Sequence, residues 1–173
     1  SFRCEAFTTA TLDHPNIVPI HDIGVDADGR PIIAMKLVRG TPWNKMLEDD
    51  WEALSQDEYL GKHLPILIHV AQAVAFAHSR GLIHRDIKPS QVMVGEFDEV
   101  LLMDWGLSVT VDENALQKHK GLSILEVAPT IVTASNPAGT VAYMAPEQTL
   151  NASNRLGPWT DVYLLGGTLF YIL

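Results

Sequence analysis

The sequence contains one cysteine, Cys4, in 173 residues, so no disulfide can form within the chain. This cysteine usage is typical of a reducing compartment, and we expect a cytoplasmic location. Basic residues are also scarce, because 12 lysines and arginines accompany 21 aspartates and glutamates, a formal net charge of −9. This balance leaves no basic face, so we expect neither nucleic acid nor an anionic membrane surface as a partner.

Long apolar runs are missing as well. The best of them, residues 162–173, is shorter than the ~20 residues of a membrane helix, so we expect no membrane segment in this stretch. No signal peptide opens the chain, which starts without an initiator Met and stops inside an apolar run, so both ends are expected to be truncations. A hydrophobic content of 47% excludes a disordered chain and allows one domain with a core.

Residues 84–91 read His-Arg-Asp-Ile-Lys-Pro-Ser-Gln, and residues 104–106 read Asp-Trp-Gly. Phosphoryl transfer needs a carboxylate to receive the proton of the attacking hydroxyl, a cation near the γ-phosphate, and oxygen ligands for a metal ion. Asp86 and Lys88 offer the carboxylate and the cation from one short loop. Gln91 and Asp104 offer hard oxygen ligands suited to Mg²⁺. The two segments together therefore predict phosphoryl-transfer chemistry.

A third motif follows at residues 139–147, Gly-Thr-Val-Ala-Tyr-Met-Ala-Pro-Glu. Taken one at a time, these residues are better explained by structural roles, His84 as a core histidine and the acids as solvated turn residues. Three motifs in this order leave a chance match at roughly one in a hundred or below. The set resembles the eukaryotic-type protein kinase family, whose catalytic loop runs H-R-D-x-x-x-x-N before D-F-G. Among its members, the bacterial Ser/Thr kinases are the most similar in these motifs.

The resemblance implies an α+β, bilobal, protein-kinase-like fold, cut at both ends. Residues 1–38 would be the remnant of the small lobe, and residues 39–173 a mostly helical large lobe that extends to the helix after the activation segment. The Gly-rich phosphate loop and the strand lysine of the family have no counterpart in this sequence. We therefore expect the isolated chain to be inactive, although its parent is an enzyme.

The resemblance also assigns catalytic roles. Asp86 would be the base and Arg85 its neighbour in the catalytic loop, whereas Asp104 would hold the metal. Lys88 resembles the lysine of the Ser/Thr-specific branch, and Thr140 would bond both Asp86 and Lys88. The substrate would then be a protein that presents a Ser or Thr hydroxyl.

The expected cofactors are ATP and Mg²⁺, with Mn²⁺ as the alternative metal. Glu5 resembles the helix C glutamate that pairs with the strand lysine, or it is a surface residue of a short amphipathic helix. Met35 falls at the gatekeeper position behind the adenine, although plain core packing explains it nearly as well. Lys36 and Val38 fall in the hinge, whose backbone would bond the base.

Local patterns predict the elements around these motifs. Two β-branched runs, 17–25 and 31–38, flank an Asp-Gly turn signal. A short helix is expected to start at Pro42 with Thr41 as its N-cap. A long helix is expected over 62–80, ended by Gly81, with a stripe of buried aliphatic residues that share its inner face (Leu67, Val70, Ala71, Val74 and Ala77).

Further along, short strands at 92–94 and 100–103 would present Asp104 toward Asp86. The final helix would open at Thr160 or Asp161, with Leu165, Leu169 and Leu173 along one side. In the family, the acid at position 161 bonds backbone N–H groups of the catalytic loop.

Residues 104–147 are expected to form a long activation segment at the surface, because they show no core periodicity. A phosphate on Thr133 or Ser135 would bond Arg85 in a charge-assisted pair. Trp105 replaces the usual Phe; its larger ring is expected to fill the family's apolar slot against helix C, while its indole N–H requires a partner.

Gln91 departs from the family pattern, which has Asn at this position. The extra methylene moves the amide oxygen by up to ~1.5 Å, whereas Mg²⁺ tolerates little departure from octahedral geometry. Two hypotheses follow: a fragment of an active Ser/Thr protein kinase, or a pseudokinase that works as a binding or scaffolding module. The intact Asp86, Lys88 and Asp104 favour the enzyme.

Overall fold

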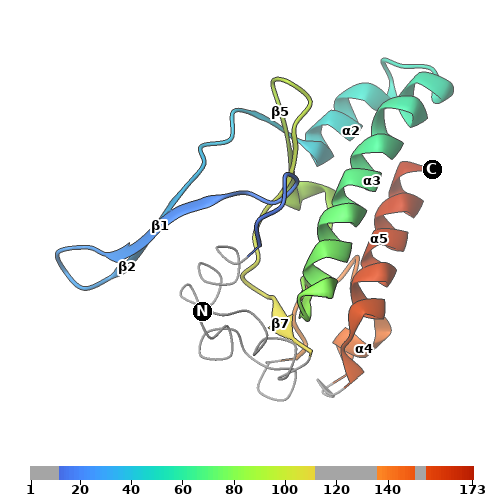
Figure 1. The fold of residues 1–173 in the computed structure, drawn as a ribbon. Helices are drawn as coiled ribbons and strands as arrows, with labels where there is room; N and C mark the ends of the chain where they lie inside the picture. The colour runs from blue at the N-terminus through green and yellow to red at the C-terminus, as the bar shows by residue number, and fades with distance from the viewer. Residues whose placement is uncertain (1–11, 112–135, 151–154) are drawn as a thin grey trace.

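The computed structural model describes residues 12–111, 136–150 and 155–173. They form a mixed α and β fold in which two long helices lie side by side and small antiparallel sheets lie to one side of them (Figure 1). The described elements are, in order, β1 (Ile20–Val25), β2 (Pro31–Met35), β3 (Gly40–Pro42), α2 (Trp43–Trp51), α3 (Gln56–Ser79), β4 (Leu82–Ile83), η1 (Pro89–Gln91), β5 (Val92–Gly95), β6 (Val100–Leu102), β7 (Val109–Thr110), α4 (Pro146–Thr149) and α5 (Pro158–Ile172). The predicted α+β composition is confirmed in these residues.

Helix α3 begins six residues earlier than the sequence pattern predicted, at Gln56. Ser55 and Glu58 form a capping box, in which the carboxylate of Glu58 accepts the Ser55 backbone N–H over 3.1 Å. Pro65 therefore lies inside the helix. Gly81 follows the C-cap residue with φ 75°, the left-handed conformation in which helices commonly end, as predicted.

The inner face of α3 packs into the main core. Val70, Val74 and Ala77 are buried as predicted, whereas Leu67 is only partly buried. By length and composition, α3 is the one helix in the described segments that is apolar enough to cross a membrane, a property that core helices also have. The helix intersperses His and Gln among its aliphatic residues. Its buried stripe is the ordinary feature of a core helix.

The strands form three small sheets. β1 and β2 make an antiparallel hairpin, which ends at Met35 where the pattern had extended the second strand to residue 38. β5 pairs with β6 as predicted, and β3 adds to the outer edge of β5. Residues 40–42 were expected to cap and start a helix; they are instead this edge strand, because Thr41 and Pro42 pair with Val94 and Met93. Helix α2 consequently starts at Trp43.

Helix α5 begins at Pro158, with Gly157 at the N-cap position, so Asp161 lies in its first turns and does not cap it. Its buried stripe is Asp161, Leu164, Thr168 and Ile172, one position away from the predicted Leu165-Leu169-Leu173 side. The shift turns the carboxylate of Asp161 inward, toward the loop that follows α3 and β4.

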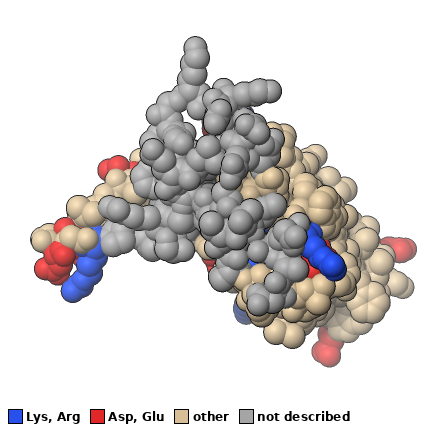
Figure 2. Space-filling model, turned by 90° about the horizontal axis from the view of Figure 1, so that it is seen from below, with Lys and Arg blue, Asp and Glu red and all other residues tan. Residues whose placement is uncertain are grey.

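The β1–β2 hairpin projects away from the body formed by α2, α3 and α5 (Figure 1). One short parallel bridge, Ile17 to Leu102, ties the start of the hairpin to β6. On the face shown in Figure 2, the described charged side chains lie mostly at the hairpin end and the opposite edge, with no continuous charged patch. The division into lobes at residue 38 stays a prediction.

Candidate active site

The loop after β4 is held in place by α5. The two carboxylate oxygens of Asp161 accept the backbone N–H groups of His84 and Arg85, each over 2.8 Å. From α3, His78 places its Nε2 atom 2.8 Å from the same carboxylate. Asp161 is fully buried, so these contacts replace the water that the carboxylate loses on folding. This is the contact that the resemblance implied for Asp161.

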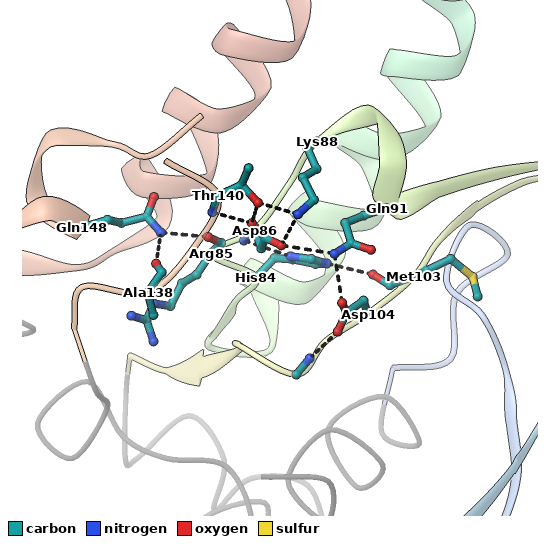
Figure 3. A network of polar contacts seen from close by, with 11 residues as sticks. His84, Arg85, Asp86, Lys88, Gln91, Met103, Asp104, Ala138, Thr140 and Gln148 are labelled. Carbon is teal, nitrogen blue, oxygen red and sulfur yellow. Dashed lines mark hydrogen bonds and ion pairs between the residues drawn. The ribbon is translucent and has the colours of Figure 1, made fainter. Parts of the chain in front are cut away.

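Arg85 has a left-handed backbone, with φ 74°, which a residue other than glycine adopts only at a cost. Its peptide groups are fixed on both sides: Asp161 accepts the N–H, and the side-chain amide of Gln148 donates to the carbonyl over 2.7 Å. This conformation directs the next residue, Asp86, into a cluster of polar side chains (Figure 3).

The carboxylate of Asp86 is the centre of that cluster. Lys88 Nζ donates to one carboxylate oxygen over 2.8 Å, and Gln91 Nε2 donates to the same oxygen over 3.1 Å. The other oxygen accepts the Thr140 N–H over 2.8 Å and the Thr140 hydroxyl over 2.7 Å. Lys88 also donates to the Thr140 hydroxyl oxygen. The predicted link from Thr140 to both Asp86 and Lys88 is therefore present.

The electrostatic state of Asp86 follows from these donors. Burial alone would raise the pKa of Asp86, but the hydrogen bonds from Lys88, Thr140 and Gln91 outweigh it and lower the pKa below its ordinary value of 3.8. Asp86 is thus an ionised acceptor at neutral pH. One side of the carboxylate is taken by Thr140, and the other faces Lys88 and Gln91 (Figure 3).

Asp104 lies on the other side of Gln91. It follows β6 with φ 53°, and one of its carboxylate oxygens accepts the Gly106 N–H over 3.2 Å. The Nε2 atom of Gln91 donates to the second oxygen over 2.9 Å while it also donates to Asp86. The structure therefore brings Asp86, Gln91 and Asp104 together, with the amide nitrogen of Gln91 between the two carboxylates.

The donor set fits a hard cation that also has phosphate and water ligands. Among the described residues, no group of three or more His, Cys, Asp or Glu side chains could hold a metal by itself. Mg²⁺ does not require one, because it commonly binds through one or two carboxylates together with substrate phosphates and water. The exposed carboxylate of Asp104 suits that role. An oxygen-ligand role for Gln91 requires its amide to turn over, and it stays a prediction.

Trp105 is 1% exposed, and its ring packs against His84 at 4.6 Å between ring centroids. The larger ring is therefore buried, whereas the helix against which it was expected to pack lies outside the described residues. Its indole N–H has no hydrogen-bond partner among the described residues. His84, 0% exposed, contacts the Met103 carbonyl oxygen through Nε2 over 3.1 Å. The two rings thus link the catalytic loop to the segment that carries Asp104.

The guanidinium of Arg85 contacts the activation segment. It donates to the Leu107 carbonyl over 3.3 Å and to the side-chain oxygen of Asn136 over 3.3 Å. Burial lowers the pKa of Arg85, opposed by the nearby negative charge of Asp161. Thr133 and Ser135, the predicted phosphorylation sites, lie outside the described residues. A phosphate contact to Arg85 stays a prediction.

The proposed adenine-contacting residues are separate from this cluster. In the described residues, no hydrogen bond or ion pair links Met35, Lys36 or Val38 to the carboxylates of Asp86 and Asp104. Met35 is 41% exposed, so the alternative of plain core packing is wrong. The Lys36 side chain pairs with Glu99 in the β5–β6 turn over 2.5 Å. The base-binding role of these positions stays a prediction, and Glu5 lies outside the described residues.

Sequence reasoning missed three contributors to the site. These are His78, which contacts Asp161, Asn136, which contacts Arg85, and Gln148, which donates to the Arg85 carbonyl. The Gln148 contact had a local signal, because glutamine three residues after an N-cap position typically bonds back to the N-cap N–H. His78 and Asn136 act over long sequence separations, so no local pattern reveals them.

The protein kinase domain family matches residues 1–173. Serine/threonine-protein kinase PknD of Protochlamydia amoebophila is 36% identical over 184 residues, covering 99% of this chain and 18% of PknD. PknA of Mycobacterium tuberculosis is 34% identical over 169 residues, covering 95% of this chain and 34% of PknA.

The kinase domain of PknI from Mycobacterium tuberculosis, solved as a crystal structure, has a TM-score of 0.64 to this chain at 31% identity. The likeness covers 99% of this chain and 55% of that one. The chain thus spans about half of a solved kinase domain and a smaller share of the curated relatives.

Proposed function

This chain belongs to the protein kinase domain family, and from that membership we propose that it is the catalytic part of a Ser/Thr-specific protein kinase. One observation carries the proposal. Lys88 and Thr140 both contact the carboxylate of Asp86, so a base, a cation and the end of the activation segment meet at one point. The hydrogen bonds among these residues suit phosphoryl transfer, in which positioning and charge neutralisation supply most of the catalysis.

In the proposed reaction, a Ser or Thr hydroxyl of a protein substrate attacks the γ-phosphorus of ATP. A new O–P bond forms, the bond to the bridging oxygen breaks, and ADP leaves. Asp86 accepts the hydroxyl proton, and its lowered pKa keeps the carboxylate ionised and able to accept at neutral pH. Lys88 neutralises charge on the transferred group.

Asp104 would hold Mg²⁺ beside the phosphates, with Gln91 as the second side chain at the metal. The metal would supply charge neutralisation on the phosphate oxygens. Because the amide nitrogen of Gln91 faces both carboxylates, its oxygen is directed away from them. A loosely held metal, with Mn²⁺ serving better than Mg²⁺, is the expected consequence. The single cysteine, Cys4, supports a cytoplasmic setting for this chemistry.

The same Gln91 contact favours the second candidate, a pseudokinase that works as a binding module. An amide N–H group between Asp86 and Asp104 satisfies both carboxylates without a metal. In that case the chain would keep the kinase fold and bind a partner protein without transferring phosphate. The two candidates differ in one measurable property, transfer of the γ-phosphate.

The test is incubation of the full-length protein with γ-labelled ATP, Mg²⁺ or Mn²⁺, and a generic basic protein. We expect label on Ser or Thr of the acceptor, and its absence with Lys88→Met, whose side chain has similar length without the charge. Label on Tyr would contradict the Ser/Thr assignment. No transfer with either metal would favour the binding module.

A further inference from the structure

Gln148 is a buried glutamine that bonds three separate parts of the chain. It is 0% exposed, at the third position of α4. Its Nε2 group donates to the Arg85 carbonyl over 2.7 Å and to the Ala138 carbonyl over 2.9 Å, while its oxygen accepts the Ala145 N–H over 3.0 Å. Both amide hydrogens and the oxygen are thus matched, which fixes the orientation of the group.

The position of these two carbonyls explains what the contact can do. The Arg85 carbonyl belongs to the strained, left-handed residue just before Asp86. The Ala138 carbonyl lies two residues before Thr140, whose N–H and hydroxyl both donate to Asp86. Gln148 therefore cross-links the two backbone segments that carry the catalytic carboxylate and its Thr partner (Figure 3).

Gly139 lies between these segments and shows how closely they approach. A Cβ atom at this position would lie 2.9 Å from the Gln148 nitrogen and 3.1 Å from the Arg85 carbonyl oxygen. The φ of 133° also disfavours any residue with a side chain. The backbone at Gly139 thus packs directly on the Gln148 amide, so that the cross-link and the glycine depend on each other.

We propose that Gln148 is a positioning residue for phosphoryl transfer. It holds the Arg85 and Ala138 carbonyls so that Asp86 and Thr140 stay within hydrogen-bond distance of each other. The inference rests on the proposed kinase function. Gln148 does not contact the reacting atoms, and it acts through the backbone of its two partners. The competing explanation is that Gln148 only caps α4 through its bond to the Ala145 N–H.

Gln148→Glu separates the two explanations. The variant keeps the oxygen that accepts the Ala145 N–H, and it replaces the donating nitrogen by an oxygen that faces two carbonyls. The pKa of the introduced carboxyl is expected to be raised by burial and by those carbonyls. Below that pKa the acid is neutral and again donates one hydrogen bond; above it the carboxylate repels both carbonyls. The defect should therefore be pH-dependent.

The experiment measures kcat and KM for ATP in the full-length wild-type, Gln148→Glu and Gln148→Met proteins between pH 6 and 8.5. At the alkaline end we expect kcat of Gln148→Glu to fall about 10- to 100-fold, the scale of two lost hydrogen bonds, with KM for ATP nearly unchanged. Toward pH 6 its deficit relative to wild type should shrink. Gln148→Met, which cannot donate at any pH, should show a constant deficit.

Amide hydrogen exchange of residues 84–88 and 136–145 gives a second readout that needs no activity. We expect faster exchange in both segments of Gln148→Glu at alkaline pH, relative to wild type at the same pH, and a smaller difference near pH 6. If Gln148→Glu does not fold by circular dichroism, Gly139→Ala, which displaces the same amide, should show the same faster exchange and kcat loss.

Three outcomes would overturn the inference: wild-type exchange in both segments, a kcat equal to wild type, or a deficit in Gln148→Glu that does not change with pH. If wild type shows no phosphate transfer but the variants show the expected faster exchange, the proposed function is contradicted and the structural cross-link by Gln148 is supported.

Discussion

Thr140 and Asp86, 54 positions apart in the sequence, are joined by two hydrogen bonds to the same carboxylate oxygen. The backbone N–H of Thr140 donates over 2.8 Å and its hydroxyl over 2.7 Å. The hydroxyl also accepts from Lys88, so a single Thr oxygen connects the proposed base to the proposed phosphate-binding cation. The end of the activation segment is thus a structural part of the site.

Replacing Thr140 by Val should separate the contribution of the Thr140 hydroxyl from that of its backbone N–H. The backbone N–H bond to Asp86 remains, but the hydroxyl donor and the Lys88 acceptor are lost. A hydrogen bond to a charged group contributes about 1.5–3 kcal/mol, so kcat/KM should fall by roughly 10- to 100-fold. Thr140→Ser, which keeps the hydroxyl, is the matched control and should stay near wild type. Equal kinetics for Val and wild type would remove Thr140 from the site.

Gln91 gives a prediction about metal dependence. Gln91→Asn places the shorter family amide beside Asp104, so the metal should bind more tightly and activity at low Mg²⁺ should rise. Gln91→Ala should lower the rate by raising the activation free energy by ~1–3 kcal/mol, the scale for losing a charge-assisted partner. Initial rates over a Mg²⁺ and a Mn²⁺ titration measure both effects. A metal dependence that neither substitution alters would show that Gln91 is not a metal ligand.

The lowered pKa of Asp86 predicts a pH dependence of stability. Burial raises this pKa, but the donors Lys88, Thr140 and Gln91 outweigh it, so the folded state binds the proton less readily than the unfolded state. The stabilising contribution is present above the ordinary value of 3.8 and is lost as pH falls through the lower folded-state value.

The measurement is the urea midpoint of wild type and Asp86→Asn from pH 7 to pH 3. The difference between the two proteins should change below pH 4, where wild type loses the contribution that the variant lacks throughout. A difference that stays constant across the whole range would contradict the shifted pKa.

Much of the site could be predicted from sequence because its motifs are local. The roles in segment 84–91 and at Asp104 were predicted from the spacing of the residues in the sequence. β5 and β6 were predicted from short β-branched runs around a turn. The contact from Asp161 to the loop was implied by the family resemblance, and the structure shows it with both backbone N–H groups. In the loop and the two strands, neighbours in the sequence are also neighbours in the structure, whereas the Asp161 contact was available only through the resemblance.

Other parts depend on tertiary packing, which a single sequence does not reveal. The register of α5 was wrong by one position because Leu165 and Leu164 are equally apolar, and only the inward Asp161 fixes which of them is buried. Residues 40–42 read as a helix start because Thr and Pro favour that position, but pairing with β5 overrides this preference. The donor orientation of Gln91 depends on two carboxylates that meet only in the fold.

Asp86 is proposed to act in the transfer of phosphate and not in the binding of nucleotide. The most direct measurement compares the full-length wild type with Asp86→Asn for both ATP affinity in Mg²⁺, by calorimetry, and the rate of γ-phosphate transfer to a Ser/Thr protein substrate. For Asp86→Asn we expect nucleotide affinity within a few-fold of wild type and a transfer rate lower by ~10²–10⁴-fold, the contribution of a positioned general base. Transfer by Asp86→Asn at the wild-type rate would contradict it.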